Sequence, residues 1–300
     1  NISHTINVND TTAPAVTGSI TPSVIEGCSI GAAPVAVTTV AAMEALAGNL
    51  QIADACTVDA NLTVTSSQTT AGTCPIVITR TYKVTDACGN TSIDIIHTIN
   101  IDDTIAPQAT GSITTSTYEG CSVEEAPLTA TTVAALEALT GNLQVSDGCT
   151  ADNNLVVTSS QTATGTCPIV ITRTYMVTDA CGNTSAPIIH TINLNDTNPP
   201  EATGTLSMIN VEGCSIADAP AAVTTVAALE ALPGNLLVTD GCTSDANITV
   251  THSQTTSGSC PLVVTRTYVV ADACGNTAST VQVIQVDDNT SPVITGSIAK

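Results

Sequence analysis

The sequence predicts an all-β protein built from tandem sandwich modules, and three observations lead to this prediction. The stretch "VTDACGNTS" begins at Val84 and again, unchanged, at Val177, and the near copy "VADACGNTA" begins at Val270. All 12 cysteines recur with the same spacing of 93 residues. Most of each repeat consists of short stretches of alternating apolar and polar residues, separated by turn residues. A period of this length suits a small domain that folds by itself, so we expect copies of one module.

The alignment of the repeats gives the expected domain boundaries. "HTINVNDTTAP" from His4 matches "HTINIDDTIAP" from His97, which closes a full repeat. We therefore assign 1–13 to the last strand of a preceding repeat, 14–106, 107–199 and 200–291 to repeats 1, 2 and 3, and 292–300 to the start of a following repeat. Two explanations stay open: the chain is a window cut from a longer array, or its two ends complete each other between molecules.

Each repeat is expected to contain a β-hairpin with two disulfides around it. "NLTVTSS" and "PIVITRTYKVTD" both alternate, and "TTAG" between them supplies a turn near Gly72. That turn would place Cys56 opposite Cys88 and would leave Cys74 at the far end of the strand, too far from Cys88, so Cys28 remains as the partner of Cys74. An even number of cysteines without closely spaced pairs favours disulfides in an oxidising compartment. The predicted pairs are Cys28–Cys74, Cys56–Cys88, Cys121–Cys167, Cys149–Cys181, Cys214–Cys260 and Cys242–Cys274.

A short helix and a tight corner complete the expected module. "TTVAAMEALAGNL" and its two copies combine strong helix formers with a glycine just past the end, which predicts about two helical turns. In the corner "DACGN", Asp86 can accept backbone hydrogen bonds, Gly89 permits a positive φ angle and Asn90 tolerates the left-handed region. Asp86 is also a possible metal ligand. Short strands, turns and one helix in about 90 residues together predict an immunoglobulin-like β-sandwich.

One arginine in each repeat shares its strand face with apolar residues. Arg80 has the same parity as Ile78 and Tyr82, so its guanidinium group is expected to point inward. Because an unpaired buried charge is costly, we predict a carboxylate partner and a structural ion pair. The candidates are Arg80, Arg173 and Arg266 with Glu26, Glu119 and Glu212, or alternatively with Glu44, Glu137 and Glu230 on the helix.

The segments between repeats suggest a cation site. "NVNDTTAP", "NIDDTIAP", "NLNDTNPP" and "QVDDNTSP" each place Asn or Asp side chains just before a proline. Clustered carboxylates and amides supply the oxygen ligands that calcium prefers, and the pattern resembles the calcium-binding linkers of cadherins. A polar turn ended by proline is the alternative. The candidate ligands are Asn9, Asp10, Asp102, Asp103, Asn195, Asp196, Asp287 and Asp288, and calcium is the one cofactor expected.

The composition excludes several classes of function. A net charge of -21 with only five Lys and Arg residues rules out the neutralisation of phosphates that nucleic-acid binding needs. No apolar run is long enough to span a membrane. His4, His97 and His190 occupy equivalent positions, but Val283 takes that position in the third repeat, so a repeated catalytic histidine is not supported. No nucleophile, phosphate-loop or histidine metal motif is present, and we expect no enzyme activity.

The stretch "CPIVITRTYKVTDACGNTS" from Cys74, with "DDTIAP" from Asp102 and the copies of both, resembles the hyalin-repeat-like immunoglobulin domains of secreted bacterial surface adhesins, including those linked to gliding motility. The resemblance covers all three repeats and implies an extracellular or cell-surface location. It further implies a disulfide-stapled, elongated rod that extends or forms an adhesive fibre. The expected partners are neighbouring repeats or identical subunits end to end, and surface glycans or other cells. Two alternatives remain: a self-assembling filament joined by strand exchange, and an array of carbohydrate-binding modules.

Overall fold

The structure is a computed structural model in which residues 2–296 are described. The chain divides into two compact units. The first consists of Asn1–Ile113, Ala130–Ser159 and Tyr175–Ile188, and the second of Thr114–Thr129, Ser160–Thr174 and Ile189–Lys300. Repeats 1 and 3 therefore lie almost entirely in one unit each, whereas repeat 2 contributes segments to both.

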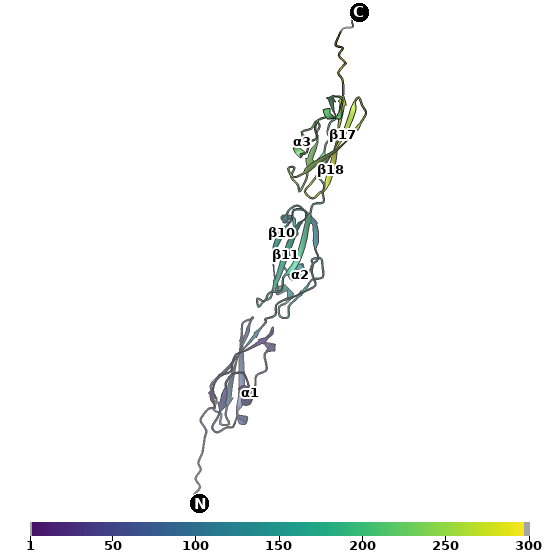
Figure 1. Ribbon diagram of the computed structural model, residues 1–300. Coiled ribbons are helices and arrows are strands. Elements are labelled where there is room, and N and C mark those ends of the chain that lie inside the picture. Colours follow the sequence, from purple (N-terminus) through teal and green to yellow (C-terminus); the bar gives the residue numbers. More distant parts are fainter. Residues whose placement is uncertain (1, 297–300) are drawn as a thin grey trace. The chain divides into compact units, whose positions relative to one another are not determined.

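Each of the three repeats has a four-stranded sheet, a two-stranded sheet and one five-residue α-helix, and Figure 1 labels the three helices. In repeat 1 the larger sheet has the order β2 (Ser23–Glu26), β6 (Ile95–Asp102), β5 (Ile76–Thr85), β4 (Thr63–Ala71), and the smaller one pairs β1 (Ala15–Thr17) with β3 (Gln51–Ala53). Its helices are α1 (Val40–Glu44) and the 3-10 turns η1 (Ile30–Ala32) and η2 (Asp59–Asn61).

The other two repeats reproduce these elements, except that repeat 3 has one 3-10 turn where repeats 1 and 2 have two. Repeat 2 has the order β10 (Val156–Thr164), β11 (Ile169–Thr178), β12 (Ile188–Asn195), β8 (Ser116–Glu119), with β7 (Gln108–Thr110), β9 (Gln144–Ser146), α2 (Val133–Glu137), η3 (Val123–Glu125) and η4 (Asp152–Asn154). Repeat 3 has β14 (Ile209–Glu212), β18 (Thr277–Asp287), β17 (Leu262–Ala271), β16 (Thr249–Ser257), with β13 (Glu201–Thr203), β15 (Leu237–Thr239), α3 (Val226–Glu230) and η5 (Ile216–Asp218). The predicted all-β class of immunoglobulin-like modules, each with a short helix, is confirmed.

The helix is shorter than predicted, and its ends are fixed by side chains. α1 has five residues, and the hydroxyl of Thr39 at its N-cap accepts a hydrogen bond from the Ala42 N–H at 3.2 Å. At the other end, the Glu44 carboxylate accepts from the Ile52 N–H of β3 at 2.8 Å. The equivalent glutamates Glu137 and Glu230 do the same. These carboxylates therefore tie the helix to a strand and are not partners of the arginines.

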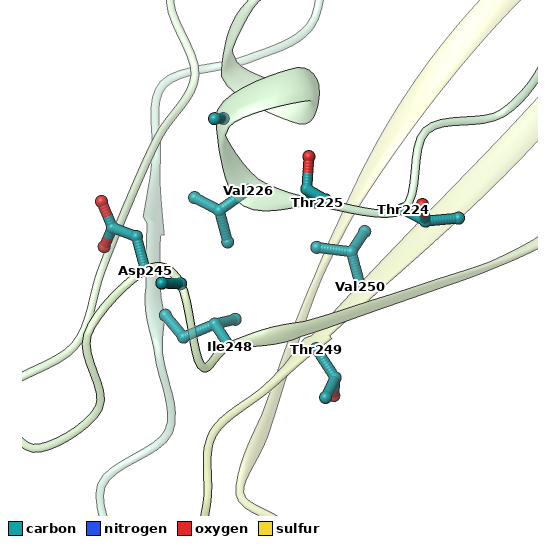
Figure 2. Close-up of a pocket in the computed structure, with 9 residues that line it drawn as sticks. Thr224, Thr225, Val226, Asp245, Ile248, Thr249 and Val250 are labelled. Carbon is teal, nitrogen blue, oxygen red and sulfur yellow. The ribbon is translucent and has the colours of Figure 1, made fainter.

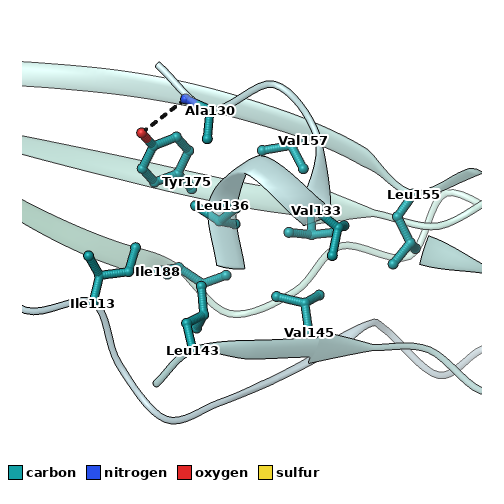
Figure 3. Close-up of a cluster of buried hydrophobic side chains, with 11 residues drawn as sticks. Ile113, Ala130, Val133, Leu136, Leu143, Val145, Leu155, Val157, Tyr175 and Ile188 are labelled. Atoms are coloured by element: carbon teal, nitrogen blue, oxygen red, sulfur yellow. Dashed lines mark hydrogen bonds between the residues drawn. The ribbon is translucent and has the colours of Figure 1, made fainter. Parts of the chain in front are cut away.

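Small aliphatic side chains and one tyrosine fill the core of each repeat. In the first unit, Val133 and Leu136 of α2 pack with Leu143, Val145 and Tyr175 (Figure 3). Tyr175 is completely buried, and its hydroxyl accepts a hydrogen bond from the Ala130 N–H at 3.3 Å. This bond satisfies the polar end of the largest core side chain, as a buried tyrosine requires.

The cysteines are bonded from one repeat to the next, and the predicted pairing within each repeat is wrong. The four bonds, with Cα–Cα distances between 4.9 and 5.3 Å, are Cys28–Cys149, Cys74–Cys181, Cys121–Cys242 and Cys167–Cys274. The first two lie in the first unit and the other two in the second. Four cysteines are free and exposed, namely Cys56, Cys88, Cys214 and Cys260.

The prediction failed because the hairpin turns later than expected. Thr63 pairs with Thr85 and Ala71 with Val77, so the turn follows Ala71, and Cys56 precedes the paired part of β4. Cys56 therefore has no place opposite Cys88 in the hairpin. At the other end of the repeat, β2 runs parallel to β6, and this arrangement carries Cys28 to the end of the repeat where Cys74 also lies. That end meets the next repeat, a contact that the pattern of a single module cannot reveal.

The predicted ion pairs of the arginines are also wrong, because a glutamine lies opposite each arginine. Arg80 is 5 % exposed, and its Nε and Nη2 atoms donate to Gln68 Oε1 at 3.3 and 3.1 Å, while Nη2 also donates to the Pro34 carbonyl at 2.9 Å. Arg173 and Arg266 donate to Gln161 and Gln254 in the same way. Glu26, Glu119 and Glu212 instead accept hydrogen bonds from residues of the segments between repeats. Neutral oxygens thus satisfy the buried guanidinium groups.

The histidines lie on the other side of these arginines. His97 pairs with Arg80 across β5 and β6, and Gln282, not Val283, lies opposite Arg266 in repeat 3. The shift arises because repeat 3 has one residue fewer in this part of the chain: Gln282 follows Arg266 by 16 positions, whereas His97 follows Arg80 by 17. His97 Nε2 is hydrogen-bonded to the Ser23 hydroxyl at 2.9 Å, and burial followed by the charge of Arg80 lowers the pKa of His97. The imidazole is therefore a neutral structural group at pH 7.

Candidate metal centre at the repeat junctions

Three aspartates from separate segments meet at each of the three described junctions before repeats 1, 2 and 3. One comes from the segment before the repeat, one follows the short third strand, and one opens the "DACGN" corner. The clusters are Asp10 with Asp54 and Asp86, Asp103 with Asp147 and Asp179, and Asp196 with Asp240 and Asp272. In the first and third clusters, carboxylate oxygens of all three residues lie within 4.8 Å of one another. The first two clusters belong to the first unit and the last to the second.

The corner aspartate is held by its own turn. Asp86 Oδ1 accepts hydrogen bonds from the backbone N–H groups of Cys88 and Asn90, both at 2.8 Å. Its Oδ2 accepts from the Asn90 side-chain amide at 2.7 Å. Gly89 has a φ angle of 90°, which a residue with a Cβ atom rarely adopts. The predicted roles of Asp86 and Gly89 in the corner agree with this geometry.

The other two carboxylates are fixed by similar local bonds. Asp54 Oδ1 accepts from the N–H groups of Cys56 and Thr57 at 3.0 and 2.7 Å. Asp10 Oδ1 accepts from the Thr12 N–H at 2.9 Å, and the Asn90 amide donates to the Asp10 carbonyl oxygen at 3.1 Å. Asn90 thus connects the corner to the segment between repeats. The same amide bond recurs from Asn183 to Asp103 and from Asn276 to Asp196.

These bonds leave at least one carboxylate oxygen in each cluster without a partner. The Oδ2 atoms of Asp10, Asp103 and Asp196 are buried and accept no hydrogen bond, and Asp147 Oδ2 is in the same state. Asp103 is 5 % exposed and Asp196 3 %. A buried polar atom without a partner is costly, and an anionic oxygen more so. These unpartnered carboxylate oxygens are therefore free to coordinate a cation.

The electrostatics of the clusters lead to the same conclusion. Burial raises the pKa of Asp103 most, and the charges of Asp147, Asp179 and Glu26 add to the increase. The pKa of Asp196 is raised by burial and by its own neighbours in the same way. Among residues 2–296 the only ion pair joins Lys83 to Asp94, so no basic side chain neutralises a cluster. In the second and third clusters a proton or a cation would relieve this repulsion, and a set of carboxylate oxygens fits calcium.

The structure separates the predicted ligands into two groups. Asp10, Asp103 and Asp196 lie in the clusters. The residues just before Asp103 and Asp196 do not: Asp102 Oδ1 lies 3.5 Å from Cys74 Sγ, and Asn195 Oδ1 lies 3.5 Å from Cys167 Sγ. Asp287 takes the same position beside Cys260, Asp288 lies beside Cys214, and Asn9 is exposed. Asp102 and Asn195 are the last residues of β6 and β12, and the next residue of an extended chain points to the other side, which explains why Asp103 and Asp196 differ from them.

Sequence reasoning missed the aspartates that follow the third strand. Asp54, Asp147 and Asp240 stand two residues before a cysteine, in "DACT" and two copies of "DGCT". Their signal was repetition at the 93-residue period, as for the corner aspartates. Only folding shows that these loops point at the preceding segment.

Repeat 3 has a surface hollow of about 510 Å³ beside α3. Figure 2 shows its labelled lining, Thr224, Thr225 and Val226 at the start of α3 and Asp245, Ile248, Thr249 and Val250 across from them. No aromatic side chain lines it. The hollow lacks the flat aromatic surface on which a sugar ring could stack, and it offers one carboxylate.

The chain matches no family model and no curated protein sequence. Solved structures with some similarity are cadherin ectodomains. The extracellular cadherin domains 1–5 of protocadherin gamma B2 share 10% identity at a TM-score of 0.32 over 93% of this chain and 60% of that one. The human desmocollin-1 ectodomain shares 13% at 0.26 over 90% and 61%, and mouse cadherin-23 EC22–24 shares 11% at 0.29 over 92% and 99%. These scores are too low to place the chain in a family.

Proposed function

We propose that this chain is the structural repeat region of an extracellular adhesin or surface filament. It acts as a disulfide-stapled stalk, and its repeat junctions are stiffened by calcium. The observation that carries the proposal is the pair of disulfides from each repeat to the next. Two covalent bonds across one junction restrict rotation about it far more than a peptide linker alone, which is the property a stalk needs.

The location follows from the same bonds. Disulfides persist in oxidising surroundings, so we place the protein outside the cell or on its surface. None of the helices within residues 2–296 is long and apolar enough to cross a membrane.

Calcium belongs to the proposal because two of the three clusters lie at the junctions that the disulfides cross. Asp103, Asp147 and Asp179 would hold the ion of the second junction, and the Oδ2 atoms of Asp103 and Asp147, which have no hydrogen-bond partner, are the first ligands expected. A bound cation would link the segment between repeats to the loops of the repeat that follows. It would also remove the repulsion among the three carboxylates, so the junction would become stiffer.

A structural role also accounts for the histidines. His97 and His190 are 5 % and 2 % exposed, each lies beside a buried arginine, and each is bonded to a serine hydroxyl. Neither can reach a substrate in solution. We propose that the chain has no catalytic activity.

Small-angle X-ray scattering of the oxidised chain, with calcium and with a chelator, tests the stalk. We expect an extended particle, at roughly 40 Å per repeat from strands of about ten residues and a linker. Chelation should broaden the distribution of interatomic distances while the disulfides keep the repeats in order. A compact particle with repeats folded on one another would overturn the proposal.

The two alternatives are less well supported. In a strand-exchanged filament, residues 1–9 of one copy would fill a neighbour's sheet, but β6, β12 and β18 already occupy the last-strand position of the three repeats. Another strand would have to displace β18. A carbohydrate-binding array would use the loops, where the hollow beside α3 has no aromatic lining. A glycan array probed with the oxidised chain separates this role from that of a spacer.

A further inference from the structure

The four free cysteines form two pairs with complementary positions in the repeat. Cys56 and Cys88 of repeat 1 correspond to Cys149 and Cys181, which accept bonds from the preceding repeat. Cys214 and Cys260 of repeat 3 correspond to Cys28 and Cys74, which form the other side of the same junction. We call the face around Cys56 and Cys88 the receiving face, and the face around Cys214 and Cys260 the donating face.

The receiving face has the same local geometry as its bonded equivalents. The Cys56 N–H donates to Asp54 at 3.0 Å, and the Cys149 N–H donates to Asp147 at 2.9 Å. In the corner, the Cys88 and Cys181 N–H groups donate to Asp86 and Asp179, both at 2.8 Å. The loops that hold these free thiols are therefore already arranged as in a completed junction.

The donating face is also arranged as in a completed junction. Cys260 Sγ lies 3.4 Å from Asp287 Oδ1, and the bonded Cys167 Sγ lies 3.5 Å from Asn195 Oδ1. The Cys214 N–H donates to Asp218 at 3.0 Å, as the bonded Cys121 donates to Glu125 at 2.9 Å. All four free cysteines are exposed, and so are residues 2–9 ahead of the receiving face. Neither pair of thiols is covered by its own chain.

We propose that the donating face of one copy of this chain docks on the receiving face of a second copy and is locked there by two disulfides, Cys214 to Cys56 and Cys260 to Cys88. The junction so formed repeats those that the chain builds twice within itself. The inference deepens the proposed end-to-end partnering by naming the bonds that hold it.

The chemistry needs an oxidant, which we take to be a small-molecule disulfide such as oxidised glutathione. One protein thiolate attacks the glutathione disulfide and releases one glutathione thiol. The partner thiolate then attacks the mixed disulfide and releases the second. Each protein disulfide thus forms as two thiol protons are lost and one glutathione disulfide is reduced to two thiols.

The test is oxidation of the purified chain with a glutathione buffer at pH 8.5, followed by a non-reducing gel and peptide mapping. We expect a ladder of multiples of 30.1 kDa that collapses on reduction, with Cys214–Cys56 and Cys260–Cys88 as the new links. A chain that stays monomeric, or that bonds Cys56 to its own Cys88, would overturn the proposal.

Two variants, each without the thiols of one face, test whether assembly joins the donating face to the receiving face. The double variant Cys56→Ser with Cys88→Ser lacks the receiving thiols, and Cys214→Ser with Cys260→Ser lacks the donating thiols. Each alone should stay monomeric, and a mixture of the two should stop at a dimer. Dimers from either variant alone would mean random crosslinking of exposed thiols. The gel counts covalent links whatever the particle's shape, so failure here is distinct from failure of the stalk proposal.

Discussion

At the scale of single residues, neighbouring acidic positions before each repeat have different roles. Asp103 is buried in a carboxylate cluster with an unpartnered oxygen, while Asp102 is turned towards the sulfur of Cys74. The two residues are adjacent and chemically identical. They therefore form a matched pair for testing the candidate metal centre.

We predict that Asp103→Asn removes one calcium site from the chain and that Asp102→Asn removes none. The amide keeps the size of the side chain but loses the charge that a hard cation needs. Isothermal titration calorimetry of the oxidised, chelator-treated chain should give three sites, then two for Asp103→Asn. Equal stoichiometry in both variants would show that the clusters do not bind the ion.

The buried histidines should make stability depend on pH. Burial, then Arg80 or Arg173, lowers the pKa of His97 and His190, whereas in the unfolded chain a histidine has a pKa near 6.5. As the pH falls below about 6.5, these histidines bind protons in the unfolded chain but stay neutral in the folded chain. The stability that these residues contribute is therefore complete above about pH 6.5, and it decreases from there towards their lower folded pKa values.

We predict that the double variant His97→Gln with His190→Gln loses less stability on acidification than the unmodified chain. Glutamine is chosen because Gln282 has this place in repeat 3. Thermal melts between pH 7.5 and 5.5, recorded in chelator, measure the free energy of unfolding of both proteins. The unmodified chain should lose up to about 1.4 kcal/mol more than the variant per histidine for each pH unit below 6.5. If the free energy of unfolding falls equally with pH in the two proteins, the buried histidines do not cause the pH dependence. The comparison cancels the opposite effect of Asp103 and Asp196, whose raised pKa values favour the folded state in acid.

At the scale of elements, a glycine determines how closely the start of each repeat approaches the loop after its helix. Gly111 has a φ angle of 76°, and a Cβ atom there would lie 2.2 Å from the Asn142 carbonyl oxygen. Such an overlap with backbone cannot be relieved by turning a side chain. The bridge between Ile113 and Gly141 holds the same two segments together.

We predict that Gly111→Ala lowers the free energy of unfolding of the first unit by about 2 kcal/mol or more, through the forbidden φ angle and the backbone contact. Gly148→Ala is the control, because no atom lies within 4 Å of its Cβ position and its φ angle is not positive. Hydrogen exchange of strands β7 and β9 reports the change. Similar exchange in both variants would show that the close approach contributes little.

The sequence predicted the strands, helix and corner of one module because these depend on local alternation, propensity and turn residues. It failed wherever a side chain meets another strand or another repeat. Gln68 lies opposite Arg80, where it can accept the hydrogen bonds of the guanidinium group, only because of the register between β4 and β5. Cys28 finds Cys149 only because one repeat abuts the next. Of the predicted metal ligands, Asp103 lies in a carboxylate cluster and Asp102 does not, and the loop aspartates lay too far along the chain to be connected with them.

At the scale of the whole molecule, the disulfides shorten the covalent path between the two ends. From the amino end the path runs to Cys28, crosses to Cys149, continues to Cys167 and crosses to Cys274. About 70 residues of backbone then separate the two ends, or roughly 240 Å when extended, against about 1,000 Å for the whole chain.

We predict that a single oxidised chain pulled by its ends in an optical trap stops extending at roughly 240 Å. The backbone that the disulfides bypass bears no tension and cannot extend. Adding a reductant should release the remaining length, to about 1,000 Å. Extension beyond the shorter limit without reductant would mean that the bonds between repeats are absent.

The same overlapping bonds make the chain tolerant of proteolysis. The ring closed by Cys28 and Cys149 overlaps the one closed by Cys74 and Cys181, and the next two rings continue the overlap as far as Cys274. Every peptide bond from Cys28 to Cys274 therefore lies inside at least one ring. A protease that cuts any one of them leaves both halves joined through sulfur, so the continuity of the molecule does not depend on a single peptide bond.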